Sequence, residues 1–298
     1  MRTPFFDLAQ VEAATGMRLL TPPARYRPDR DRPVLPSDAA TWLDVCQTTQ
    51  AHQEIALGQP RGWPDQWTLT RRSSGSESTS TARDALPLDL LTADPMRNTT
   101  WHRNSTARAG LHHMGSTGRL HWHESLFEKN LLIALDFDGG LSDLASQPFT
   151  LTWTEGRKTF RHTPDFLAVI DGEVWVLNVR PAALMNLLLL RNAAAVHALC
   201  RLHGWRDAVV TDYARPALTV LTTLAAACGA HDPFGLTDAI LNRLGDGPAR
   251  FGDLVAATSA PAVARAVLQR LLWDQTVSTD LNRLLTDDSM LRLTAVTS

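Results

Sequence analysis

The sequence predicts an α/β core followed by a smaller unit of short helices and a β-hairpin. Short apolar runs, among them Phe166–Ile170 and Val174–Val179, are separated by polar turns and flanked by helical patterns. After Phe234 the apolar residues recur at helical spacing in three short runs. A chain of 298 residues is too long for one compact core, so we expect two structured units.

The composition favours a protein that folds in water. Hydrophobic residues make up 44% and charged residues 20% of the chain, so most of it can bury enough apolar surface to offset the entropy of ordering. The longest apolar stretches, Leu184–Leu190 and Leu218–Cys228, are shorter than the roughly 20 residues of a bilayer-spanning helix. Prolines break the opening segment, which argues against a secretion signal. The three cysteines show no paired spacing, which argues against disulfides and against a cysteine zinc site and favours the cytosol.

The N-terminal part of the chain is weakly specified. It contains one helical candidate, Ser37–Leu57, and then a polar, serine-rich run, Arg71–Thr81, which is typical of a linker. The expected divisions are an N-terminal extension over residues 1–70, a low-complexity linker over 71–98, the core over 99–230 and the smaller unit over 231–298.

The core is predicted to contain two β-hairpins flanked by helices. Asp171–Gly172 favours a tight turn between the two apolar runs named above. The other expected elements are a helix at Glu124–Leu135, a hairpin of Phe149–Trp153 with Thr159–Arg161, a helix from Pro181 to His203, a strand at Ala208–Thr211 and a helix from Arg215.

The smaller unit is predicted to begin with three amphipathic helices, the third entered through Pro261. Gln275–Thr279 and Arg283–Leu285 are then expected to pair as a wing. Three short helices and a hairpin are the layout of a winged-helix domain.

Polar side chains collect at one end of the predicted Asp171–Gly172 hairpin. Asp165 precedes the first strand, and Asn178 and Arg180 end the second on a shared face, because strand side chains alternate. An acid, an amide oxygen and a cation then converge, as hydrolysis of a phosphodiester requires: Mg²⁺ held by oxygen ligands, with a water beside a phosphate.

A further carboxylate is expected from the preceding helix. Glu128 projects from its first turns, and Glu124 competes for the same role, since helical spacing does not separate them. Each residue also has a purely structural interpretation. Asp165 could be a turn residue after proline, Glu128 a solvated helix residue beside a cation, and Arg180 an ion-pair partner.

Six short blocks, in order along residues 110–215, resemble the TnsA endonuclease subunit of heteromeric transposases, a member of the PD-(D/E)XK nuclease superfamily. The blocks are Ser116–His121, Ser125-x-x-Glu128, Leu135–Asp138, Ser146–Phe149, Thr163–Leu167 and Asn178–Ala182. The resemblance implies a restriction-endonuclease-like α/β core, with a central mixed sheet flanked by helices, and a C-terminal winged-helix domain. It also implies that Glu128, Asp165, Asn178 and Val179 bind Mg²⁺, for which Mn²⁺ can substitute, and that Arg180 completes the catalytic set.

The implied activity is cleavage of double-stranded DNA at transposon ends, beside a DDE-type transposase subunit and with an ATPase regulator as a further partner. The implied location is the bacterial cytoplasm, at the nucleoid. Arg180 stands where the family pattern has lysine, and arginine cannot deprotonate water but can orient it or stabilise negative charge. Two alternatives therefore remain: a catalytically impaired nuclease fold that serves as a DNA-binding or assembly subunit, and a free-standing restriction-like nuclease.

The candidate DNA contacts come from an acid-free stretch between Asp94 and Glu124. The net charge of -2 gives no overall sign of nucleic-acid binding, so local clustering of cations has to supply it. The predicted contacts are Arg103, Arg108, Arg119 and His121. An ordinary solvated loop explains the same stretch.

Overall fold

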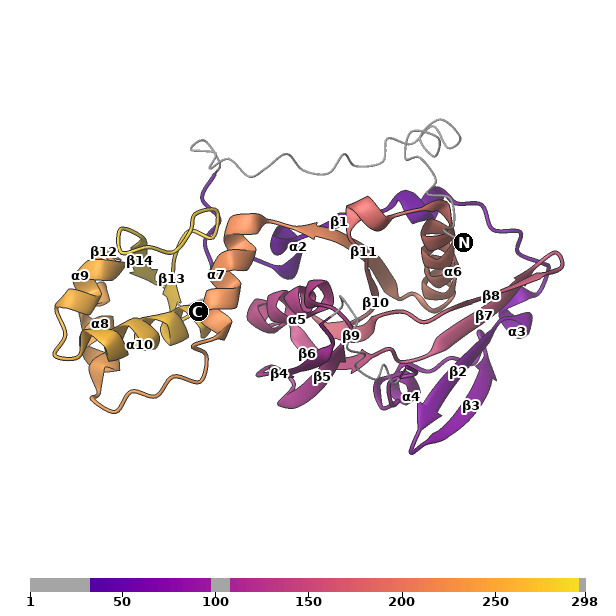
Figure 1. Ribbon diagram of the computed structural model, residues 1–298, viewed down its shortest axis with the longest axis horizontal. Coiled ribbons are helices and arrows are strands. Elements are labelled where there is room, and N and C mark those ends of the chain that lie inside the picture. Colours follow the sequence, from indigo (N-terminus) through magenta and orange to yellow (C-terminus); the bar gives the residue numbers. More distant parts are fainter. Residues whose placement is uncertain (1–32, 98–107, 295–298) are drawn as a thin grey trace. The chain divides into compact units, whose positions relative to one another are not determined.

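The computed structural model describes residues 33–97 and 108–294 as a mixed α/β protein with two compact units (Figure 1). Of these residues, unit 1 comprises 47–97, 108–132 and 139–212. Unit 2 comprises 33–46, 133–138 and 213–294. No helix within the described ranges combines the length and the apolarity needed to cross a bilayer.

A mixed five-stranded sheet forms the centre of unit 1. Its strand order is β1-β11-β10-β9-β6. Strand β10 runs parallel to β11 and antiparallel to β9, which is itself antiparallel to β6, so the predicted mixed sheet is confirmed. The strands are β1 (Cys46–Thr49), β6 (Leu141–Ser146), β9 (Phe166–Ile170), β10 (Glu173–Val179) and β11 (Arg206–Tyr213).

Helices flank this sheet. Helix α6 (Leu187–His203) buries Val196 and Leu199 in the same core as Val176 of β10. Helix α5 (Leu126–Asp138) begins in unit 1 and ends in unit 2. The shorter helical elements of unit 1 are η1 (Ala51–Glu54), α3 (Trp63–Gln66), α4 (Pro87–Leu91) and η2 (Ala182–Leu184).

The predicted linker is wrong, because its first part is a β-hairpin. Strand β2 (Thr68–Ser73) pairs with β3 (Ser76–Thr81), and β2 also pairs with β7 (Thr150–Glu155). Ser74 and Gly75 take positive φ values of 50° and 78°, which the two-residue turn of a hairpin requires. Pairing with β7 gives this polar segment backbone partners that its composition alone does not reveal.

The rest of the strands of unit 1 form two small sheets. The hairpin just described continues through β7 to β8 (Lys158–His162), which confirms the predicted turn between them. A separate two-stranded sheet pairs β4 (Gly110–Met114) with β5 (Arg119–His123).

Two helix predictions need correction. The candidate Ser37–Leu57 contains only one helical turn, α2 (Trp42–Val45), before the chain enters β1, because pairing with β11 outweighs the weak helical pattern. The helix predicted from Pro181 begins later, at α6. Asn186 caps it by accepting a hydrogen bond from the Leu189 N–H at 3.0 Å.

Unit 2 contains the predicted short helices and a three-stranded sheet with the order β12-β14-β13. The predicted wing strand Arg283–Leu285 is wrong, since that segment lies in the loop before β14. The compact unit extends beyond the predicted start at residue 231, because its C-terminal segment begins at residue 213. Its elements are α7 (Arg215–Ala225), α8 (Leu236–Gly245), β12 (Ala249–Arg250), α9 (Phe251–Ala256), α10 (Pro261–Trp273), β13 (Val277–Ser278) and β14 (Met290–Leu293).

Part of the predicted N-terminal extension also belongs to unit 2. The Ser37 N–H donates to the Thr279 carbonyl at 2.8 Å, and the Leu281 N–H donates to the Leu35 carbonyl at 2.8 Å. Residues 33–46 therefore complete this unit rather than precede the fold.

Candidate active site

Asp165 immediately precedes β9, at the end of the central hairpin. The β9–β10 ladder ends at the pair Phe166–Leu177, which leaves the Val179 N–H without a partner on β9. Asp165 Oδ2 accepts that N–H at 2.7 Å. The residue is 7% exposed, so the hydrogen bond fixes a carboxylate that is almost out of contact with water.

Asn178 and Arg180 converge with Asp165, as the hairpin pattern predicts. The three residues line one small cavity of about 20 Å³, together with Val179. A space of this size holds about one water molecule or one metal ion. Asn178 Oδ1 lies 2.7 Å from Nε2 of His162, which ends β8 and lines the same cavity.

Glu128 lies in the first turn of α5 and takes part in its N-terminal cap. Ser125 Oγ accepts the Glu128 N–H at 3.1 Å. In return, Glu128 Oε1 accepts from the Ser125 hydroxyl at 2.8 Å and Oε2 accepts from the Glu124 N–H at 2.7 Å. This reciprocal arrangement resembles a capping box, and the spacing Ser-x-x-Glu is its sequence signature. The functional interpretation of Glu128 therefore has a structural competitor.

Arg97 lies between Glu124 and Asp165. Its Nη1 lies 3.5 Å from Glu124 Oε2, and its Nη2 lies 4.0 Å from Asp165 Oδ1. No local sequence pattern marks Arg97 as a site residue. Its only signal was membership of the acid-free cationic stretch.

Burial dominates the electrostatics of this site. Burial, followed by the charge of Glu128, raises the pKa of Asp165 to about 7, against the opposing effects of the Val179 hydrogen bond and of the charges of Arg180 and Arg97. Burial also raises the pKa of Glu128, and the charge of Glu124 adds to that effect. Burial lowers the pKa of His162 to about 4, so its imidazole is neutral at pH 7.

These residues fit a divalent cation. Burial disfavours the charged forms of both Asp165 and Glu128, and the charge of Glu128 also disfavours ionisation of Asp165. A cation between the two carboxylates would stabilise their charged forms. Carboxylate, amide and backbone carbonyl oxygens are the donors that Mg²⁺ and Mn²⁺ prefer. Asp165, Asn178 and the Val179 carbonyl would hold the ion at the small cavity. Glu128 would join them by exchanging one of its cap hydrogen bonds.

The structure describes three of the four predicted DNA contacts, of which two are exposed and one is buried. Arg103 lies outside the described residues, and Arg108 is exposed. Arg119 is exposed but forms an ion pair with Asp143. The predicted role of His121 does not fit the structure, because the residue is 5% exposed and its Nε2 lies 2.7 Å from Thr117 Oγ1. A buried ring with this neighbour does not present itself to a phosphate.

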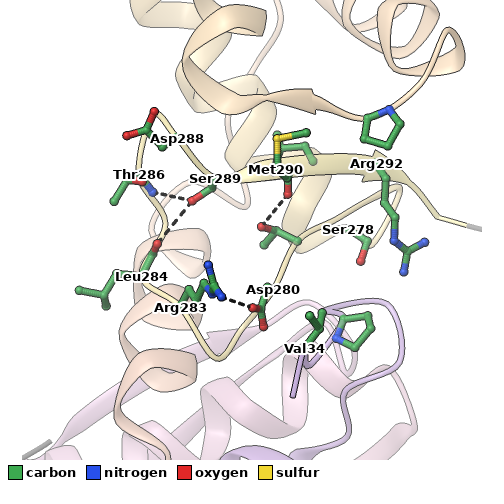
Figure 2. Close-up of a pocket in the computed structure, with 14 residues that line it drawn as sticks. Val34, Ser278, Asp280, Arg283, Leu284, Thr286, Asp288, Ser289, Met290 and Arg292 are labelled. Atoms are coloured by element: carbon green, nitrogen blue, oxygen red, sulfur yellow. Dashed lines mark hydrogen bonds and ion pairs between the residues drawn. The ribbon is translucent and has the colours of Figure 1, made fainter. Parts of the chain in front are cut away.

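Unit 2 contains a much larger cavity, of about 610 Å³ (Figure 2). Its carboxylate Asp280 accepts the Leu35 N–H at 3.0 Å and lies 3.4 Å from Arg283 Nε. The side chains of Leu284 and Met290 are more than half exposed there. The paired acid and the apolar rim are features of a contact surface rather than of a reaction site.

No protein-family model matches this chain, and no curated protein matches it either.

Proposed function

We propose that the protein is a metal-dependent DNA endonuclease of the PD-(D/E)XK type, and that it acts as the TnsA-like subunit of a heteromeric transposase. One observation carries the proposal: the buried carboxylate of Asp165 lines the same small cavity as Asn178 and Arg180, and the charge of Glu128 contributes to its raised pKa. Perturbed acids beside a fixed cation are typical of catalytic sites.

Each side chain has a role that its position supports. Mg²⁺ at this site would supply Lewis-acid chemistry and lower the pKa of a bound water. Asp165 and Glu128 would balance the positive charge of the ion with their carboxylates. Neutral His162 orients the Asn178 amide by donating from Nε2 to Oδ1. Arg180 would stabilise the negative charge that develops on the scissile phosphate, because a guanidinium is cationic and donates hydrogen bonds to phosphate oxygens.

The finer parts of the proposal concern the fold and the partners. The mixed sheet supports a restriction-endonuclease-like core, and the order of helices and strands in unit 2 supports a winged-helix domain. The proposed partners are double-stranded DNA, a DDE-type transposase and an ATPase regulator. These assignments rest on the resemblance of the sequence blocks.

Metal-dependent nicking of supercoiled plasmid DNA tests the proposal. Asp165→Ala and Glu128→Ala should abolish Mg²⁺- or Mn²⁺-dependent nicking, because each removes an oxygen ligand from an ion that needs several. Glu173→Ala is the matched control, since Glu173 is an exposed acid of the same hairpin, paired with Arg206. Circular dichroism should show all three variants folded. Nicking by Asp165→Ala at the wild-type rate would overturn the assignment.

Glu124 and Glu128 are separated by the same assay. Loss of nicking in Glu124→Ala but not in Glu128→Ala would assign the metal to Glu124 and leave Glu128 as a helix cap. A second candidate function is favoured by two features. Both carboxylate oxygens of Glu128 already accept hydrogen bonds in the helix cap, and Arg180 stands in place of the family's lysine. In this alternative the fold binds DNA and assembles the complex without cutting. Retained DNA binding with no nicking under any metal would support it, and nicking without partner proteins would support a free-standing nuclease.

A further inference from the structure

A second group of metal-ligating side chains lies in unit 1, apart from the candidate active site. His52 Nε2 lies 2.6 Å from Asp207 Oδ2, and His197 Nδ1 lies 2.7 Å from Asp207 Oδ1. The donor atoms of the three residues all lie within 4.8 Å of one another. Each residue comes from a different element: η1, α6 and β11. The sequence gives no signal for this group, because its members are far apart in the chain or show no metal-ligand spacing.

The group is deeply buried. The side chain of His52 is 0% exposed, that of Asp207 is 7% exposed and that of His197 is 21% exposed. Hydrogen bonding to Asp207 satisfies only one side of the His52 ring. Within the part of the chain that the structure describes, His52 Nδ1 is buried and has no hydrogen-bond partner. An ion bound at Nε2 would leave this nitrogen unpaired, so only the atoms in contact with Asp207 indicate a metal site.

An open position adjoins the group. A cavity of about 350 Å³ is lined by both His52 and His197, and it is otherwise lined by residues such as Gln53, Trp63 and Arg201. The His52 side chain is fully buried and that of His197 is 21% exposed, so a water molecule or a small ligand in this cavity would approach the group from the side of His197. Three protein ligands beside an accessible fourth position are the arrangement of a zinc site that keeps one exchangeable ligand.

We infer that His52, His197 and Asp207 form a binding site for a divalent transition-metal ion, with Zn²⁺ as the ion whose ligand preferences they match. Two imidazoles and one carboxylate are nitrogen and oxygen donors that Zn²⁺ accepts at about 2.0–2.2 Å. A tetrahedral ion holds its donor atoms about 3.3 Å apart, so each imidazole has to withdraw from Asp207 by about 0.7 Å. The side chain of His197 is more exposed than that of His52, so it has the greater freedom to make this movement.

The ion would fasten three elements around the central sheet. Asp207 lies opposite Val176 of β10, and it shares a face of β11 with Val209, which lines the small cavity of the candidate active site. Helix α6 carries His197 and also lines that cavity through Ala193. Zinc would therefore fix α6 on the sheet beside the candidate active site without taking part in its chemistry. The inference does not depend on the proposed nuclease function.

Zinc titration of the full chain tests the inference. In competition with a chromophoric chelator, the wild-type chain should bind one Zn²⁺ with an affinity that falls at least tenfold in His197→Gln and in Asp207→Asn. His113→Gln is the matched control, because His113 is an exposed histidine outside the group. Zn²⁺ should also raise the melting temperature of the wild-type chain and of the control, but not that of His197→Gln.

Two further measurements keep the test decisive. Asp165→Ala should still bind one Zn²⁺, and loss of zinc in that variant would show that the ion occupies the candidate active site instead. X-ray absorption of the zinc-loaded wild-type chain should show imidazole scattering from two histidines, and this measurement needs no variant to fold. Absence of bound zinc, absence of imidazole scattering, or unchanged affinity in His197→Gln would overturn the inference.

Discussion

Asp165→Asn should stabilise the metal-free protein at neutral and alkaline pH. Burial, followed by the charge of Glu128, raises the pKa of Asp165 from 3.8 to about 7. One pKa unit corresponds to about 1.4 kcal/mol, so ionising this carboxylate in the folded protein costs up to about 4 kcal/mol. Asparagine is uncharged and keeps an oxygen that accepts the Val179 N–H, so it removes the cost and retains the bond.

The pH dependence has a definite sign. An acid whose pKa is higher in the folded than in the unfolded chain binds more protons when folded, so the stability it contributes is lost as the pH rises. For Asp165 that loss extends from a pH near 3.8 to a pH of about 7. The difference in unfolding free energy between Asp165→Asn and the wild-type chain should therefore grow through this window and remain constant above it.

Denaturant titrations in the presence of a metal chelator, at several values of pH, measure this difference. Each kcal/mol of unfolding free energy changes the melting temperature of a chain of this size by roughly 2–4 °C. The melting temperature of the variant at alkaline pH should therefore be several degrees above that of the wild-type chain. Added Mg²⁺ should reduce the gap by stabilising the wild-type chain alone. Asp89→Asn is the control, because this carboxylate is 50% exposed and its surface pair with Arg71 contributes little. A variant less stable than the wild-type chain at alkaline pH, or a gap independent of pH, would refute the reasoning.

Other perturbations give separate tests of the site and its surroundings. Arg180→Lys should preserve or raise nicking activity and Arg180→Met should lose it, because a positive charge beside the scissile phosphate is required; equal rates in all three chains would show a structural arginine. His162→Gln should remove the loss of stability that the wild-type chain suffers as the pH falls from 6.5 to about 4, since burial lowers the pKa of His162 over that window. An equal loss of unfolding free energy between pH 6.5 and about pH 4 in the variant and the wild-type chain would contradict this. Ser125→Ala should cost about 1 kcal/mol in denaturant titrations by removing the cap of α5, and no measurable loss would show that the cap is unimportant. Arg265→Ala should leave the affinity of the full chain for duplex DNA within about twofold, measured by fluorescence anisotropy, because the guanidinium already faces Asp287 at 2.7 Å. A tenfold weaker affinity would contradict that expectation.

Local turn chemistry explains which strands could be predicted. Asp171 and Gly172 both take positive φ, and this tight turn makes β9 and β10 recognisable from the sequence. The hairpin of β2 and β3 has a similar turn, yet its strands are mostly serine, threonine and arginine, with Leu69 buried. Its stability depends on pairing with β7, which is distant in the sequence. Composition therefore predicted a linker where tertiary contacts make a sheet.

The candidate site was predictable where strand geometry alone sets it. The alternation of side chains brings Asn178 and Arg180 to one face, and the hairpin brings Asp165 beside them. Arg97 and His162 reach the same site through contacts that no local pattern encodes. The cap around Glu128, in contrast, is encoded by its spacing to Ser125, and the same spacing also fits a metal-binding glutamate in the first turn of a helix.

The charge of unit 2 illustrates what a residue count leaves out. Residues 231–298 contain six arginines and eight aspartates, a sum that predicts weak binding to DNA. The structure adds the pairing: besides the Arg265–Asp287 contact, Arg250 Nη1 lies 3.5 Å from Asp288 Oδ1. A phosphate that approaches Arg265 has to displace Asp287 while the neighbouring carboxylate repels it. The aspartates therefore lower the attraction of individual arginines as well as the net charge, which favours a protein rather than DNA as the main contact of this unit.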